Sequence, residues 1–161
     1  MNLLAVLETI SVLKGLKKQT LEQVAGLAEA RTAVAGSSII LQGEPTRGLF
    51  VLADGVASVF RTDLEGQMLR MATLETGAFF AELSLFDPAP RTVTIMAETT
   101  CSLLHIDATD LEAYLLKIPE LDRCAFYQIA AADIASRFRD LNMDYMVSQQ
   151  MLWKQALSKS T

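Results

Sequence analysis

The chain has 161 residues, 51% of them hydrophobic, with a net charge of −5 and a pI near 4.9. This length suits a single domain with a buried core, and the hydrophobic share excludes a disordered chain. The acidic balance argues against a nucleic-acid-binding surface, no apolar run reaches the ~18 residues of a membrane span, and the N-terminus lacks the basic start of a secretory signal.

Glycine and proline divide the chain into three zones. All of them except Gly15, Gly26 and Pro119 fall between residues 36 and 90. A turn-rich middle between two helix-permissive ends is therefore expected. We predict N-terminal helices over residues 1–28, a barrel over 29–107 and C-terminal helices over 108–161, all in one structural domain.

The N-terminal zone predicts two helices. The first is indicated by apolar residues at helical spacing: Leu3, Leu4, Leu7, Ile10, Leu13 and Leu16. A second, shorter helix would begin with Thr20 as its N-cap and turn Leu21, Val24, Ala25 and Leu27 inward.

The middle zone predicts short strands. Runs rich in β-branched and aromatic residues cover residues 49–52 and 56–60, joined by the turn Asp54-Gly55. Further strands are expected over 30–35, 38–41, 67–74, 92–97 and 100–106. Seven or eight strands fit a small antiparallel jelly-roll barrel, so the fold class is mainly β with flanking helices (α+β).

Residues 77–92 carry the chain's most specific group of polar side chains. Glu82 and Arg91 lie nine residues apart. A short helical pattern lies between them, and Pro88-Ala89-Pro90 is expected to end that helix. A carboxylate can accept hydrogen bonds from sugar hydroxyls, whereas a guanidinium offers a planar fork of donors that suits phosphate. Backbone amides near residues 81–84 would point at the same anion. A ligand with both a phosphate and a ribose hydroxyl therefore fits this segment.

Two motifs resemble signatures of the cyclic-nucleotide-binding domain family. That family's phosphate-binding cassette runs Phe-Gly-Glu-Leu-Ala-Leu, a variable loop, then Pro-Arg-Thr/Ala-Ala-Thr. This chain reads Phe80-Ala81-Glu82-Leu83-Ser84-Leu85 and then Pro90-Arg91-Thr92-Val93-Thr94. Upstream it reads Gly43-Glu44, four residues, then Leu49-Phe50-Val51-Leu52-Ala53-Asp54-Gly55-Val56. The resemblance spans roughly residues 10 to 140 and is to the ligand-binding half of catabolite-activator-type regulators, without their helix-turn-helix domain.

The resemblance implies roles for individual residues. Arg91 would bind the phosphate and Glu82 the ribose, with Ala81, Leu83, Ser84 and Thr92 completing the site. Ala81 departs from the family's glycine, and its methyl group could crowd the sugar. Thr92 resembles domains that accept cyclic GMP, although cyclic AMP binders with threonine there also exist, so both ligands stay open.

The C-terminal zone predicts two helices and a dimer seam. Asp107 is a suitable N-cap for a helix from Ala108 to about Lys117. After Pro119, a coiled-coil-like seam alternates four- and three-residue spacings: Tyr127, Ala131, Ile134, Phe138, Leu141, Tyr145, Ser148 and Leu152. The alternative is a helix that packs back on its own barrel. Asn142, beside the seam, could cap the base of the ligand, across a dimer.

The sequence thus predicts a cytoplasmic, non-enzymatic sensor of cyclic AMP or cyclic GMP that signals through its C-terminal helices to a homodimer partner or an unknown downstream protein. Two alternatives remain: a dimeric interaction module that binds no nucleotide, and a sensor of another phosphorylated ligand such as a cyclic dinucleotide. His105, the one histidine, is expected to be structural, with no catalytic set around it. Cys101 and Cys124 are expected as free thiols, and no cofactor or metal site is expected.

Overall fold

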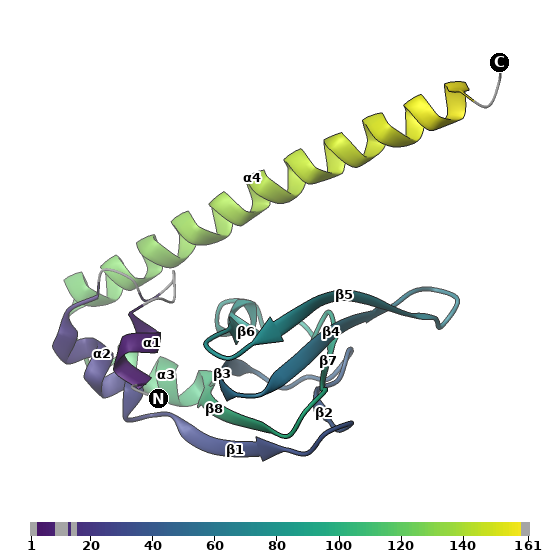
Figure 1. The fold of residues 1–161 in the computed structure, drawn as a ribbon. Helices are drawn as coiled ribbons and strands as arrows, with labels where there is room; N and C mark the ends of the chain where they lie inside the picture. Colours follow the sequence, from purple (N-terminus) through teal and green to yellow (C-terminus); the bar gives the residue numbers. More distant parts are fainter. Residues whose placement is uncertain (1–2, 9–12, 14–15, 159–161) are drawn as a thin grey trace.

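A computed structural model describes residues 3–8, 13 and 16–158. Two four-stranded antiparallel sheets face each other, with helices at one end (Figure 1). One sheet has the order β1-β8-β3-β6 and the other β2-β7-β4-β5. Their bounds are β1 Glu29–Ala33, β2 Ser38–Ile40, β3 Gly48–Asp54, β4 Val56–Thr62, β5 Met68–Glu75, β6 Phe79–Phe80, β7 Thr94–Ala97 and β8 Cys101–Asp107.

This arrangement confirms the predicted fold class, antiparallel sheets of jelly-roll type with flanking helices. The predicted strands are found with small shifts at their ends; the strand expected from Thr92 begins at Thr94. The two-residue strand β6 was not anticipated, because such a short run carries no alternation of its own. Its residues pair with Phe50 and Val51 of β3.

Strand β3 is central because it is buried on both faces. Leu49 and Val51 belong to a core cluster shared with the helices, whereas Phe50 and Leu52 belong to a second cluster between the two sheets. Successive side chains of a strand point to opposite faces, so the continuous apolar run serves both cores at once. The N-terminal end of β3, at Gly48, therefore lies between the barrel interior and the helices.

Helices α1 Leu3–Leu7, α2 Lys18–Ala25 and α3 Ala108–Leu115 lie together at one end of the barrel (Figure 1). Ile10, predicted to extend the first helix, lies outside the described residues. The predicted Thr20 cap is wrong: α2 already begins at Lys18 with Lys17 as N-cap, and Thr20 is buried inside the helix. The inward positions Leu21 and Val24 are buried as predicted.

Asp107 caps α3 as predicted, since its side chain accepts a hydrogen bond from the Thr109 amide at 2.7 Å. The carboxylate is partly buried, which by itself raises its pKa. Hydrogen bonds from Thr109 and the Asp110 amide outweigh that effect, and the pKa of Asp107 is lowered overall. The charged form of the cap is therefore the stable one.

Helix α4, Glu120–Ser158, extends well clear of the barrel (Figure 1). Phe126 and Ala130 pack into the core cluster beside the helices. Farther along, large apolar side chains are exposed: Phe138, Met143, Tyr145, Met146, Val147, Met151 and Trp153. Of the predicted seam, Tyr127, Phe138 and Tyr145 are exposed, Ile134 is partly buried, and the side chains of Leu141 and Leu152 lie outside those described.

Within the described ranges, no helix has the length and hydropathy needed to cross a bilayer. In the same part of the chain, no three His, Cys, Asp or Glu side chains gather as metal ligands would. Both cysteines are free thiols, Cys101 buried and Cys124 exposed.

Candidate functional site

A cavity of about 270 Å³ lies where residues 77–92, called the cassette below, meet the barrel interior. Glu82 and Arg91 both line it, and each is only 7% exposed. Leu83, Ser84 and Thr92 line it as well. Its remaining wall is largely apolar and comes from the two sheets and the Pro90 loop: Ile40, Val59, Phe80, Val93 and Ile95. The cavity thus has one polar end and one apolar end.

The cassette turns sharply into a 3₁₀ helix, Glu82–Leu85. Ala81 makes this turn with φ 68° and ψ 14°, the only positive φ of a residue other than glycine among the described residues. The left-handed conformation disfavours a side chain, which explains why glycine suits this position better. The turn places Glu82 at the start of the helix, facing the cavity.

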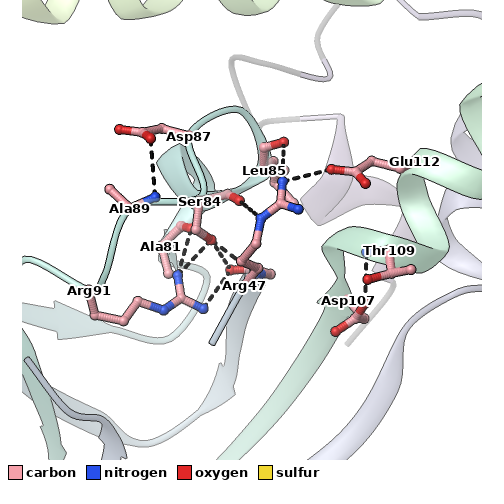
Figure 2. Close-up of polar contacts among 11 residues, drawn as sticks. Arg47, Ala81, Ser84, Leu85, Asp87, Ala89, Arg91, Asp107, Thr109 and Glu112 are labelled. Atoms are coloured by element: carbon pink, nitrogen blue, oxygen red, sulfur yellow. Dashed lines mark hydrogen bonds and ion pairs between the residues drawn. The ribbon is translucent and has the colours of Figure 1, made fainter. Parts of the chain in front are cut away.

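Arg91 lies folded against the cassette rather than extended into solvent (Figure 2). Its Nη1 donates to Ser84 Oγ at 2.7 Å and to the Ala81 carbonyl at 3.1 Å. Its Nη2 donates to the Gly48 carbonyl at 3.2 Å, and Nε makes a longer contact of 3.4 Å with Thr46 Oγ1. Burial lowers the pKa of the Arg91 guanidinium, and the Glu44 carboxylate partly offsets this. Arginine stays charged under such conditions, so a buried cation is held at the wall of the cavity.

The Ser84 hydroxyl connects Arg91 to β3. Ser84 Oγ accepts a hydrogen bond from the Gly48 amide at 2.9 Å and from Arg91 Nη1. The carbonyl oxygens of Ala81 and Gly48 lie 2.8 and 3.1 Å from it as possible acceptors for its proton. The hydroxyl is thus engaged by protein groups, and it orients the guanidinium.

The Gly43-Glu44 motif pairs with Arg91 through the backbone. The Gly43 amide donates to the Arg91 carbonyl at 2.8 Å, and the Arg91 amide donates to the Glu44 carbonyl at 2.9 Å. Gly43 has φ 85°, so it shapes the turn. This backbone pairing holds the Arg91 end of the cassette against the Gly43-Glu44 turn, so the two sequence motifs form one structural unit.

Sequence reasoning missed Arg47, which links the cassette to α3 (Figure 2). Its Nε donates to the Ser84 carbonyl at 3.0 Å and its Nη2 to the Leu85 carbonyl at 3.3 Å. The same Nη2 forms an ion pair of 2.7 Å with Glu112 of α3. Only its place in the four-residue spacer of the upstream motif could have drawn attention to it.

An aromatic contact continues this link into α4. Phe86 directly follows the 3₁₀ helix, and its ring centroid lies 5.8 Å from that of Phe126. Phe126 is fully buried at the root of α4. The cassette therefore touches both helices that follow the barrel.

Asn142 does not line this cavity; it is exposed on α4. The structure thus brings together the six predicted cassette residues, Ala81 to Ser84, Arg91 and Thr92, but not Asn142.

The sequence profile described as "Cyclic nucleotide-binding domain" matches residues 30–117. Among curated proteins, the chain is 30% identical over 123 residues to the cAMP-dependent protein kinase regulatory subunit of Aspergillus fumigatus, covering 76% of this chain and 29% of that protein. It is 28% identical to the cyclic AMP receptor protein of Thermus thermophilus, covering 81% and 58%. The chain thus spans less than two thirds of the length of these relatives.

Solved structures give the same result. The catabolite activator protein of Thermus thermophilus aligns with a TM-score of 0.72 and 26% identity, covering 85% of this chain and 62% of that one. The N-terminal domain of a transcriptional regulator from Streptomyces coelicolor A3(2) aligns with a TM-score of 0.73 and 27% identity, covering 82% and 94%. The resemblance drawn from the two sequence motifs is confirmed.

Proposed function

Because this chain belongs to the cyclic nucleotide-binding domain family, we propose that it is a regulatory domain that binds cyclic AMP or cyclic GMP in the cavity beside the cassette. The observation that carries this proposal is the meeting of Glu82 and Arg91, both nearly buried, in one cavity. No catalytic step is proposed, and the relatives named above are regulatory proteins.

The polar end of the cavity suits a cyclic phosphate joined to a ribose. Arg91 would supply the positive charge, and its planar donor group suits the phosphate oxygens. Glu82 would accept a hydrogen bond from the ribose hydroxyl, and Thr92 would add a donor. In the described structure the Arg91 guanidinium already donates to four protein oxygens, so ligand binding would exchange one of its terminal contacts, such as the 3.2 Å one from Nη2 to the Gly48 carbonyl.

The apolar end suits a purine base. Phe80, Val59 and Ile95 come from both sheets and would cover the faces of a flat ring. Thr92 would accept a hydrogen bond from the amino group of a guanine in the syn form, whereas an adenine would rely on the apolar walls alone. Asn142 would cap the base only if α4 of this copy or of a second copy came over the cavity.

The binding event would reach the helices through the cassette. Arg47 ties the cassette carbonyls to Glu112 of α3, and Phe86 contacts Phe126 of α4. A ligand that draws the cassette inward would favour one position of these helices over others, which is a shift of population between existing states.

The exposed face of α4 would be covered by a second copy of the chain. Phe138 and Tyr145 are more than half exposed, and their spacing from Ile134 and Leu141 is that of the predicted seam. A helix with such a repeat is stabilised by a partner helix. The output is then a changed homodimer or a changed contact with a downstream protein.

Isothermal titration with cyclic AMP and cyclic GMP tests the ligand. We expect heat from at least one nucleotide, and a loss of affinity in Glu82→Gln of at least about tenfold, because a ribose hydrogen bond to a charged group is lost. Asp87→Asn is the matched control, since Asp87 also borders the cavity but its carboxylate accepts from the Ala89 amide within the loop. Absence of heat from both nucleotides would favour the interaction-module alternative. Heat from cyclic dinucleotides alone would favour the other alternative, a sensor of another phosphorylated ligand.

A further inference from the structure

A second cavity, of about 250 Å³, lies beside Arg91 and is formed largely by polar residues. Arg91 lines both cavities. The second one is bordered by charged and polar side chains from β1, β8 and the segment before β3: Arg31, Glu44, Thr46, Arg47, His105 and Asp107. Phe50 lines it too, and its ring stacks at 5.4 Å on Phe80 of the first cavity. The two cavities are therefore neighbours of opposite character, one apolar and one polar.

His105 supplies the strongest indication that this cavity holds a ligand. The residue is 4% exposed, and its Nδ1 is buried with no hydrogen-bond partner among the described residues. Leaving such an atom unsatisfied is unfavourable, so a polar partner is expected. Burial lowers the pKa of His105, and the Arg31 charge lowers it further. Nδ1 has almost no accessible surface, so the ring would turn for a neutral imidazole to donate its Nδ1 proton to an anion in the cavity.

The charges around the cavity favour an anion. Three guanidinium groups line it, against two carboxylates, and because Arg47 is already paired with Glu112, Arg31 and Arg91 are the two that could turn to an anion. Both carboxylates are already held by backbone amides: Asp107 by Thr109 and Glu44 by Leu41. Arg31, by contrast, makes one long contact of 3.5 Å with Glu29 and lies 5.9 Å from the Phe50 ring. Its planar donor group suits an oxyanion.

We propose that this second cavity binds a small oxyanion of the phosphate class between Arg31, Arg91 and the imidazole of His105. The Nε side of Arg91, with its long 3.4 Å contact to Thr46, belongs to this cavity and would turn to the anion. The site itself does not depend on a nucleotide in the first cavity.

A consequence for regulation follows, and it rests on the function proposed above. Two anions would share one guanidinium and repel each other, so an anion in the second cavity would weaken nucleotide binding in the first. The coupling is reciprocal: the nucleotide weakens anion binding by the same factor.

The single histidine of the chain provides a direct test. The imidazole signals of the full chain are followed by NMR during titration with inorganic phosphate, at constant pH and with sodium chloride holding the ionic strength constant. We expect a saturable shift in the wild type and about a tenfold to a hundredfold weaker response in Arg31→Gln, as for loss of a charged hydrogen-bond donor. Arg61→Gln removes the same charge from an exposed position on β4 and should bind phosphate like the wild type.

Two results would overturn the proposal. One is an imidazole signal that does not respond to phosphate. The other is an equal saturable response in the wild type and Arg31→Gln, which would place the anion in the first cavity instead. Arg31 is exposed, so the variant is expected to fold, and its spectrum verifies this.

Nucleotide titrations with and without phosphate, again at constant ionic strength, test the coupling. Weaker nucleotide binding in the wild type but not in Arg31→Gln supports it, and an equal effect in both contradicts it. If neither nucleotide binds, the function proposed above fails, while the NMR titration still decides whether the oxyanion site exists.

Discussion

At the cassette, charged side chains are buried, whereas along the outer part of α4, apolar side chains are exposed. Glu82 and Arg91 are each 7% exposed, and Phe138 on α4 is 61% exposed. Buried polar groups persist when hydrogen bonds satisfy them, and Arg91 has four acceptors from within its own chain. The outer helix has no comparable set of contacts among the described residues. The polar contacts of Arg91 are made within one chain, whereas the exposed apolar face of α4 is the face that we propose a second copy covers.

The largest expected effect comes from removing the buried charge. Arg91→Ala should weaken cyclic nucleotide binding by about 2–5 kcal/mol, because a buried phosphate loses its charge partner. It should also lower the free energy of unfolding, since the Gly48 and Ala81 carbonyls lose a donor. Isothermal titration and urea unfolding measure the two effects. Arg61→Ala, at an exposed position of β4, is the control and should change neither; unchanged affinity in Arg91→Ala would remove this residue from the site.

The next prediction concerns α4. Phe138→Asp should weaken a homodimer by about 2 kcal/mol or more, because it places a charge in the centre of an apolar seam. Sedimentation equilibrium measures the change. Met143→Asp is the matched control, because Met143 is 63% exposed and lies off the predicted seam. Equal dissociation in both variants would show that the seam is assigned to the wrong face of the helix.

A smaller effect is expected at Ser84, where the family pattern has alanine. Ser84→Ala should lower the free energy of unfolding by about 1–3 kcal/mol, because the buried Gly48 amide loses its acceptor. Urea unfolding measures the loss, and Ser102→Ala, at an exposed position of β8, should change stability by less than about 0.5 kcal/mol. If the two variants are equally stable, the bridge between Arg91 and β3 contributes nothing.

The smallest effect is expected at Ala81. Ala81→Gly should raise the free energy of unfolding by about 0.5–1 kcal/mol, because relief of the left-handed conformation exceeds the added freedom of the unfolded chain. Ala113→Gly, in the interior of α3, should instead lower the free energy of unfolding by about 1 kcal/mol. Thermal unfolding compares them. A loss of stability in Ala81→Gly would mean that the turn does not strain alanine.

The sequence predicts local features of this fold well and contacts between distant segments less well. The Asp107 cap depends on neighbouring residues only, and it was correctly predicted. The prediction of Thr20 as an N-cap was wrong. Threonine is common at helix N-caps, but Thr20 is buried by tertiary packing that a short stretch of sequence does not reveal. Glu82 and Arg91 line one cavity because the segment between them turns back, and backbone hydrogen bonds to Gly43 and Glu44 hold its Arg91 end. Arg47 could not be predicted, since its partner Glu112 lies 65 residues away and on a helix whose position the sheet determines.

The chain's one tryptophan, Trp153, lies on the outer part of α4 and is 70% exposed. Because the barrel contains no tryptophan, the tryptophan emission of the chain reports on the outer end of α4 alone. Trp153 is not one of the seam residues, so association of two copies along the seam would leave this ring in water, and a blue shift of its emission on association would mean that the partner helix covers a second face of α4. Denaturation of the barrel alone would leave that spectrum almost unchanged, so unfolding of the barrel has to be followed by circular dichroism.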